Sequence, residues 1–336
     1  MHGLDKLNGT CHRTVTISAT MPPDPKLAAA VKPSAWLIWV CLLAVYVVWG
    51  TTYFAIKVAI EDMAPFFLVG TRFVLAGALL IGWQALRGGS APTAKQWRGA
   101  ALVGFLLLVI GNGGVAVAEH WVSSGATVAL ISIMPFATAL WSGAFGEWPR
   151  RGEWIAIALG ATGAAVMLMG RDLQASAIGT IIILFGTASW SLGTVLSRRL
   201  DIPHGPMGFG AEMLTAGIMA LAVSAAIGEH WALPHAPRVW CAWGYLVVFG
   251  SLIAFSAYRF VVERASPSLA ATYAYVNPPV ALAVGWWLGK ETFSANVLMG
   301  LPVVLGAVAL HAWIQTRVRE IPAQLPDAVR PTQNPA

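Results

Sequence analysis

Ten apolar stretches, each close to the length of one bilayer-crossing helix, follow one another along the chain with short polar segments between them. A membrane-spanning helix needs about 20 consecutive apolar residues, and isolated strands would leave backbone groups unpaired in hydrocarbon. The chain is 57% hydrophobic and 11% charged, whereas ordinary soluble domains are about 25% charged. We therefore predict an all-α polytopic membrane protein with ten transmembrane helices, near residues 36–57, 65–86, 97–118, 123–145, 152–170, 177–198, 206–228, 239–262, 267–288 and 295–316.

The two ends of the sequence lack such stretches. Residues 1–35 hold Pro22, Pro23 and Pro25 with several Ser and Thr, and no apolar core long enough for a signal peptide. This composition is typical of a disordered tail. Residues 317–336 are expected to form a second tail. Met21 is compatible with a later start codon and equally with an internal methionine.

The positions of Lys and Arg predict the orientation in the membrane. If both termini are cytoplasmic, the tails and loops on that side hold 16 of the 21 basic residues, in line with the positive-inside rule. We therefore expect a multi-pass protein of the cell (plasma or inner) membrane with both tails cytoplasmic. The basic residues are scattered singly, which excludes a nucleic-acid-binding stripe. Cys11, Cys41 and Cys241 lack metal-ligand spacing, so neither a metal site nor a cofactor is expected.

The two halves of the chain resemble each other. An offset of 143 residues aligns several positions without a gap, and offsets of 140 to 141 align earlier ones. A unit with an odd number of helices must enter the membrane from the opposite side in its second copy. We predict two inverted five-helix repeats, residues 36–170 and 177–316, with a substrate site at their interface near mid-bilayer. The aligned pairs include Ser123 with Ser266, Pro135 with Pro278, Gly163 with Gly306, Trp49 with Trp190, Gly70 with Gly210 and Gly77 with Gly217.

Several segments resemble a known family. They are WGTTYFAIKVAI at 49–60, VGTRFVLAGALL at 69–80, the proline-containing fourth and ninth helices, and LGKETFSANVLMGLPVVLGAVAL near the end. Together they are similar to the EamA type of the drug/metabolite transporter superfamily, from about Trp36 to Trp313. The resemblance implies a ten-helix, two-repeat exporter of small metabolites, with amino-acid exporters of the YddG kind as one branch. The second repeat departs from the pattern, because it reads WSLGT at 190–194 where the first reads WGTTY.

One face of the first predicted helix carries aromatic rings spaced by three or four residues, and the sixth helix repeats the pattern 141 residues later. We expect these faces to form opposite walls of a substrate cavity, in which rings supply apolar area and hydroxyls fix orientation. The alternative is that the rings anchor the helices at the membrane interface or pack against other helices. The residues are Tyr46, Trp49 and Tyr53 in the first helix and Trp190 and Thr194 in the sixth.

The ninth helix adds further candidates, since Tyr273, Tyr275 and Asn277 directly precede Pro278 and Pro279. Two adjacent prolines remove two amide donors, so we expect a break that frees carbonyls and lines the cavity. A kink that only improves packing is the alternative.

The first repeat supplies two related features. Pro135 occupies the position equivalent to Pro278, so both halves are expected to break at the same depth. Asn112 in the third helix is expected to face protein or water, either toward substrate or in a hydrogen bond between helices.

Two charges fall well inside predicted helices, Arg72 and Glu212. Each costs about 2.5 to 3.5 kcal/mol at the centre of a span on insertion scales. They occupy equivalent places under the 140-residue offset, so a pair across the repeat axis is one expectation. Arg72 is a candidate for holding a substrate carboxylate, and Glu212 for relaying a proton. The alternative is that either side chain reaches a nearby interface.

These features favour a carrier of small molecules that works by alternating access. Ring-lined walls with one Arg suit an aromatic or other amphipathic amino acid, and a multidrug or nucleotide/sugar-type transporter is the alternative. An intramembrane enzyme would need a convergent catalytic set, which the sequence lacks. A channel would need a selectivity element. We expect flux without a strict need for a proton gradient, because Glu212 is the only carboxylate deep in a predicted span. The expected partners are substrate and lipid, and the expected state is a monomer or weak homo-oligomer.

Overall fold

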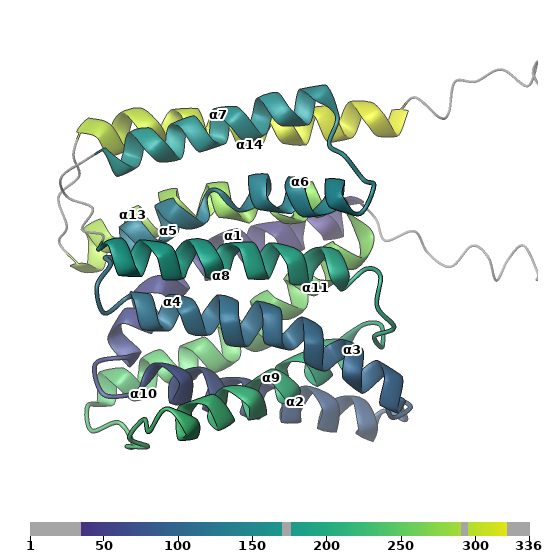
Figure 1. Cartoon of the computed structure of the whole chain (residues 1–336), viewed down its shortest axis with the longest axis vertical. Helices are drawn as coiled ribbons and strands as arrows, with labels where there is room; N and C mark the ends of the chain where they lie inside the picture. The colour runs from purple at the N-terminus through teal and green to yellow at the C-terminus, as the bar shows by residue number, and fades with distance from the viewer. Residues whose placement is uncertain (1–34, 170–175, 290–294, 321–336) are drawn as a thin grey trace, which may run out of the picture. The chain divides into compact units, whose positions relative to one another are not determined.

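The computed structural model describes residues 35–169, 176–289 and 295–320. The predicted tail at 1–35 lies outside the described residues except for Ala35, which begins the first helix, and so does the second tail beyond Glu320. The described chain consists of helices joined by short turns (Figure 1).

The helices of the first half are α1 (Ala35–Ala59), α2 (Pro65–Leu86), α3 (Ala94–Gly104), η1 (Phe105–Asn112), α4 (Gly113–Ala118), α5 (Ser124–Ile131), α6 (Met134–Ala144) and α7 (Arg151–Leu168). Those of the second half are α8 (Ala177–Leu196), α9 (Pro206–Ala226), α10 (Pro237–Tyr245), η2 (Leu246–Phe255), α11 (Ser256–Arg264), α12 (Pro267–Ala270), α13 (Tyr273–Gly289) and α14 (Ala295–Glu320). Here η marks a π-helical stretch, in which hydrogen bonds join residues five apart and the helix is wider.

Within the described ranges these elements form ten segments that match the ten predicted spans. The series α3–η1–α4 is one segment, as are α5–α6, α10–η2–α11 and α12–α13. Seven segments are long and apolar enough to cross a membrane by length and composition, counted over the described residues. The chain is therefore an all-α polytopic membrane protein.

Local signals in the sequence set where the helices begin. Pro65, Pro206 and Pro237 each occupy the first turn of a helix, where the missing amide hydrogen has no intrahelical partner to lose. Thr93 accepts a hydrogen bond from the Gln96 backbone and donates its own amide to the Gln96 side chain, which makes a capping box at the start of α3.

Equivalent helices of the two repeats pack against each other, α2 on α9 and α7 on α14 (Figure 1). The contact between α2 and α9 is reciprocal. A Cβ atom on Gly77 would lie 2.8 Å from the Gly210 carbonyl oxygen, and one on Gly217 would lie 2.9 Å from that of Gly70. Since Gly70 and Gly77 are the 140-residue counterparts of Gly210 and Gly217, the contact follows a two-fold axis. This is the arrangement of two inverted five-helix repeats.

The third and eighth segments carry π-helical stretches that end at equivalent positions, Asn112 and Phe255. Nothing in the residue pattern predicted them. They matter because π-helical turns change the direction in which side chains point and often occur at functional sites.

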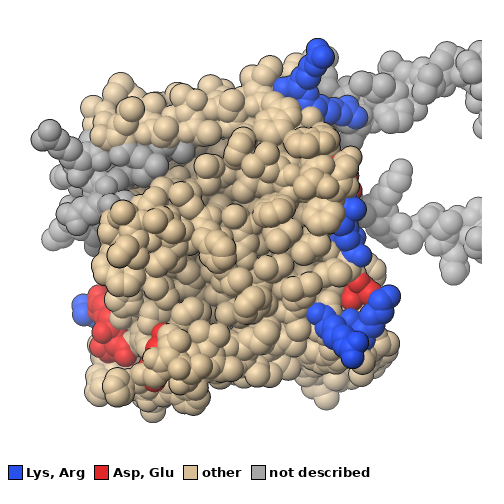
Figure 2. All heavy atoms as spheres, viewed as in Figure 1, with Lys and Arg blue, Asp and Glu red and all other residues tan. Residues whose placement is uncertain are grey.

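Charge is distributed unevenly between the two ends of the bundle. Helix α1 begins, and α14 ends, at the edge on the right of Figure 1. In the same view, most of the visible Lys and Arg side chains lie along that edge (Figure 2). The opposite end carries acidic groups, including Glu61 in an ion pair with Arg238 at 2.5 Å. We call these the basic end and the acidic end.

Candidate functional site

A cavity lies between the two repeats, with a water-accessible volume of about 50 Å³. That space has room for a few water molecules and is smaller than an amino acid. Its walls come from both halves of the chain. They comprise Trp49, Thr52, Tyr53, Ile56, Arg72, Gly111, Asn112, Val115, Ile131, Met134, Gly186, Thr187, Trp190 and Tyr273.

Aromatic rings from three segments meet at this cavity. Trp49 of α1 contacts Trp190 of α8 edge-on, with ring centroids 5.4 Å apart, and Tyr273 of α13 in the same manner at 4.8 Å. The first and sixth predicted helices therefore face each other through their tryptophans. Such edge-on pairs each contribute about 0.5–1.5 kcal/mol beyond the area that they bury.

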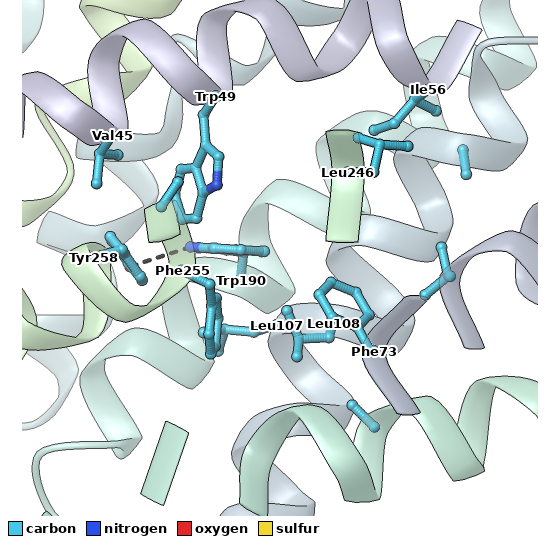
Figure 3. Packing of buried hydrophobic residues seen from close by; sticks show 14 of the residues in the cluster. Val45, Trp49, Ile56, Phe73, Leu107, Leu108, Trp190, Leu246, Phe255 and Tyr258 are labelled. Atoms are coloured by element: carbon cyan, nitrogen blue, oxygen red, sulfur yellow. Dashed lines mark hydrogen bonds between the residues drawn. The ribbon is translucent and has the colours of Figure 1, made fainter. Parts of the chain in front are cut away.

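Tyr258 of α11 completes the ring cluster, and the sequence pattern did not indicate it. Its hydroxyl accepts a hydrogen bond from Trp190 Nε1 at 3.1 Å and lies 2.6 Å from Thr194 Oγ1 (Figure 3). Its ring centroid lies 5.0 Å from that of Trp49. The 143-residue counterpart of Tyr258 is Val115, so the repeat pattern gave no signal for it.

Backbone atoms of the two π-helical stretches contact the same ring cluster. Trp49 Nε1 donates to the carbonyl oxygen of Gly250 in η2 at 3.1 Å. In η1, a Cβ atom on Gly111 would lie 2.9 Å from the Trp190 ring. Each central tryptophan therefore packs against a glycine of the other repeat, and both glycines belong to π-helical turns.

Arg72 lines the cavity and is only 3% exposed. Its carbon Cζ lies 4.3 Å from the centre of the Phe73 ring. Within the described residues, its Nε and Nη1 atoms have no hydrogen-bond partner. A buried guanidinium with unused donors is a suitable site for an anionic group such as a carboxylate, which it binds with two parallel hydrogen bonds.

Glu212 does not pair with Arg72, which corrects one expectation. Its Oε2 atom lies 2.9 Å from Nε of Arg259, in an ion pair without linear hydrogen-bond geometry. Arg259 also donates from Nη1 to Ser197 at 2.9 Å and is 2% exposed. The count of basic residues in the sequence includes Arg259 among those on the cytoplasmic side, whereas the structure buries its side chain. The pair joins α8, α9 and α11 near the basic end.

Of the remaining predicted site residues, Tyr53 and Asn112 also line the cavity, and the Asn112 Oδ1 atom has no hydrogen-bond partner within the described residues. Tyr46 and Asn277 lie outside the lining. Tyr46 bonds to Thr272 at 2.7 Å, and Asn277 Nδ2 donates to the carbonyl oxygens of Tyr273 and Tyr46. They hold α1 against α13.

Two further predicted residues also fall outside the lining. Thr194 lies behind Trp190, on the Tyr258 hydroxyl. Tyr275 points toward α7, where its ring packs directly against Gly160.

The proline positions differ from the expected symmetry. Pro135 lies in the first turn of α6, just after the interruption that follows α5. Pro278 and Pro279 lie inside α13, and the interruption comes earlier, between α12 and α13. One of the two carbonyls that the prolines free, that of Ala274, receives a hydrogen bond from a side chain instead. Pro278 cannot donate to Ala274, and Ser132 Oγ, directly after α5, donates to that carbonyl oxygen at 2.9 Å instead.

A second buried carboxylate was also missed. Glu119 directly follows α4, is fully buried, and has no hydrogen-bond partner on either carboxylate oxygen within the described residues. Lys57 donates to its backbone carbonyl oxygen at 2.7 Å. The sequence placed Glu119 just past a predicted span, where it resembles a loop residue.

No group of three or more His, Cys, Asp or Glu side chains able to hold a metal ion occurs in the part of the chain that the structure describes. The cavity is lined by aromatic rings, an amide, hydroxyls and a guanidinium with unused donors, which are the groups of a binding site.

Inverted repeats with a cavity at their interface are the architecture of membrane transporters. The model of the EamA-like transporter family matches residues 34–169 and, a second time, residues 177–313. The chain belongs to this family, within the drug/metabolite transporter superfamily.

The relatives are also transporters, and one is named for a substrate while others are uncharacterized. An uncharacterized inner membrane transporter, YedA of Escherichia coli (strain K12), is 40% identical over 270 residues, which cover 80% of this chain and 88% of YedA. An S-adenosylmethionine/S-adenosylhomocysteine transporter of Chlamydia muridarum is 27% identical over 287 residues, covering 79% of this chain and 88% of that protein. A solved crystal structure at 18% identity has a TM-score of 0.68 and covers 84% of this chain and 98% of that one, so it shares the fold.

Proposed function

We propose that this transporter carries amino acids, aromatic or otherwise amphipathic, out of the cytoplasm by alternating access at the cavity between its repeats. The observation that carries the proposal is Arg72, a buried cation with unused donors beside the rings of Trp49, Trp190 and Tyr273. A substrate with a carboxylate and an apolar side chain complements this combination.

The membrane and orientation follow from the same reasoning. We propose the inner (plasma) membrane, which the name of the relative YedA supports, and cytoplasmic tails, which the basic end supports. We propose a monomer or weak homo-oligomer as the working state. Multidrug and nucleotide/sugar-type cargoes remain the alternatives. S-adenosylmethionine also carries an amino-acid carboxylate, and one relative is named for it.

The test is exchange of radiolabelled phenylalanine in proteoliposomes containing the purified chain. Unlabelled phenylalanine inside the vesicles should accelerate uptake of the label, because a carrier exchanges cargo. Phenylalaninamide, which lacks the carboxylate, should compete poorly. S-adenosylmethionine, a quaternary ammonium drug and a nucleotide sugar complete the panel. Exchange of one of these without phenylalanine would overturn the assignment of cargo.

Arg72→Gln should weaken exchange by about 10- to 150-fold, since a hydrogen bond to a charged group contributes about 1.5–3 kcal/mol. Arg87→Gln is the matched control, because Arg87 follows the same helix and stacks on the exposed ring of Trp83. For direction, preloaded cells that express the wild-type chain should release labelled phenylalanine faster than cells that express Arg72→Gln. Equal release would contradict export through this site.

A further inference from the structure

The acidic end of the bundle contains a carboxylate that the proposed transport cycle does not use. Glu119 is fully buried, and its two side-chain oxygens have no hydrogen-bond partner within the described residues. The nearby cation, Lys57, donates to the Glu119 backbone and so does not satisfy the carboxylate oxygens by hydrogen bonding. A carboxylate left this way in a buried place strongly favours its neutral form.

At the other end of the molecule, the equivalent position borders a larger cavity. At the basic end, a second cavity with a water-accessible volume of about 210 Å³ lies between the end of α8 and α11. Its lining includes Arg198 and Val262. Arg198 is the 141-residue counterpart of Lys57, and Val262 is the 143-residue counterpart of Glu119. The 143-residue offset holds through this segment, because α3 and α10, η1 and η2, and α4 and α11 keep it at Ala94/Pro237, Asn112/Phe255 and Gly113/Ser256.

In an inverted repeat, alternating access exchanges the conformations of the two halves. When the acidic end opens, Glu119 takes the place that Val262 has now, in the wall of a cavity, whereas Lys57 is exposed already. Val262 is buried in the wall of its cavity, but a glutamate is longer and would extend into it. Exchange of the two conformations would therefore carry the Glu119 carboxylate from a dry environment into a cavity large enough for water.

We propose that Glu119 is a proton-binding latch, whose protonation closes the acidic end of the transporter and whose ionisation favours its opening. The proton is taken from, and returned to, the aqueous phase on the acidic side, when the carboxyl O–H bond forms or breaks. No net proton crosses the membrane, so the latch needs no proton gradient. It makes the balance between the two facing states depend on pH.

Electrostatics at the closed end supports the latch. Burial raises the pKa of Glu119 well above its ordinary value, and the opposing effect of Lys57 is smaller. The other titratable groups on the elements around it are Cys41, Tyr46 and Tyr53 on α1, Arg72 on α2 and the exposed His120 next in sequence. The helices α5 and α8 and the stretch η1 carry no titratable side chain.

The sign of the pH dependence follows. The pKa of Glu119 is higher in the closed end than in a hydrated one, so the closed form binds the proton more tightly. Low pH therefore favours closure. Between the two pKa values, the ratio of closed to open molecules should fall by up to about tenfold per pH unit as pH rises.

The experiment measures opening without any substrate, so it does not depend on the cargo. Spin labels are placed through Glu61→Cys and His120→Cys, on exposed residues beside the closed end, in a full-length chain whose Cys11, Cys41 and Cys241 are serine. The label at position 120 also removes the neighbouring histidine. Distance distributions are recorded in lipid nanodiscs from pH 5 to pH 8.

We expect the wider distance to gain population as pH rises in the otherwise unchanged protein. Glu119→Gln should stay closed at every pH, because its amide does not ionise. Glu119→Asp should keep a pH response, which shows that the carboxyl group is responsible. Glu147→Gln, an exposed carboxylate at the other end in an ion pair with Arg199, should behave as the parent. A parent distribution that ignores pH, or a Glu119→Gln response equal to the parent's, would overturn the latch. Failure of phenylalanine exchange would refute the proposed cargo only.

Discussion

The close two-fold contact between α2 and α9 predicts that a methyl group added there destabilises the protein, and a second glycine on α2 provides the control. A Cβ atom on Gly77 would lie 2.5 Å from the backbone nitrogen of Leu214, whereas ordinary contact begins at 3.4 Å. Since the obstacle is backbone, Gly77→Ala must push the helices apart by about 0.9 Å. Overpacking of this kind costs about 1–3 kcal/mol. Gly82, also on α2, would have no atom within 4 Å of an added Cβ atom, so Gly82→Ala meets no obstacle.

Both substitutions add the same helix preference for alanine, about 0.5–1 kcal/mol, so their difference isolates the packing cost. The assay is the midpoint of thermal unfolding of each purified variant in one detergent, followed by size-exclusion chromatography after heating. Gly77→Ala should lie about 2–12 °C below Gly82→Ala. Gly217→Ala should match Gly77→Ala, because its Cβ atom would lie 2.5 Å from the Val74 nitrogen. Equal midpoints for Gly77→Ala and Gly82→Ala would refute a tight two-fold contact.

Three further predictions concern the cavity, the buried ion pair and a helix cap. Trp190→Ala removes a ring contact and should slow phenylalanine exchange by up to about tenfold, while Trp83→Ala at an exposed site should not. Glu212→Gln leaves the Arg259 guanidinium buried without its partner and should lower the free energy of unfolding by about 3–5 kcal/mol. A variant that also replaces Arg259 with Met should recover part of this loss. The Asp62 carboxylate caps the start of α10, and hydrogen bonds from backbone amides there lower the pKa of this carboxyl group. The cap therefore contributes to stability at neutral pH, and this contribution is lost as pH falls through the lowered pKa. Asp62→Asn should remove this loss from midpoints measured between pH 7 and pH 3.

The sequence predicted well wherever a single physical requirement decides the outcome. Hydrocarbon thickness sets helix length, so the ten segments could be read from apolar runs. Helical spacing placed Trp49 and Trp190 on facing walls, and the offset between halves identified α2 and α9 as equivalent helices, although it did not predict that they pack together. Arg72 was singled out because a charge inside a span needs a reason, and the structure places it at the cavity.

Prediction failed where the answer depends on which way a long side chain points. Arg259 and Glu119 stand near segment ends, where a charge normally reaches water, yet both side chains are buried. The partner of Glu212 therefore could not be identified from spacing alone. Pro278 failed for a related reason, since whether a proline breaks a helix depends on a neighbour such as Ser132 taking the freed carbonyl. The π-helical turns left no recognisable pattern of residue types.

The difference in charge between Arg72 and Glu212 has an energetic consequence for the whole transporter. Two identical inverted halves would give inward-facing and outward-facing forms of equal free energy, because each form would be the other turned over. Here one half holds its buried charge in a pair with Arg259, and the other leaves Arg72 with unused donors. The two facing forms of the empty protein therefore need not have equal free energy, and a substrate carboxylate bound to Arg72 would change the difference between them.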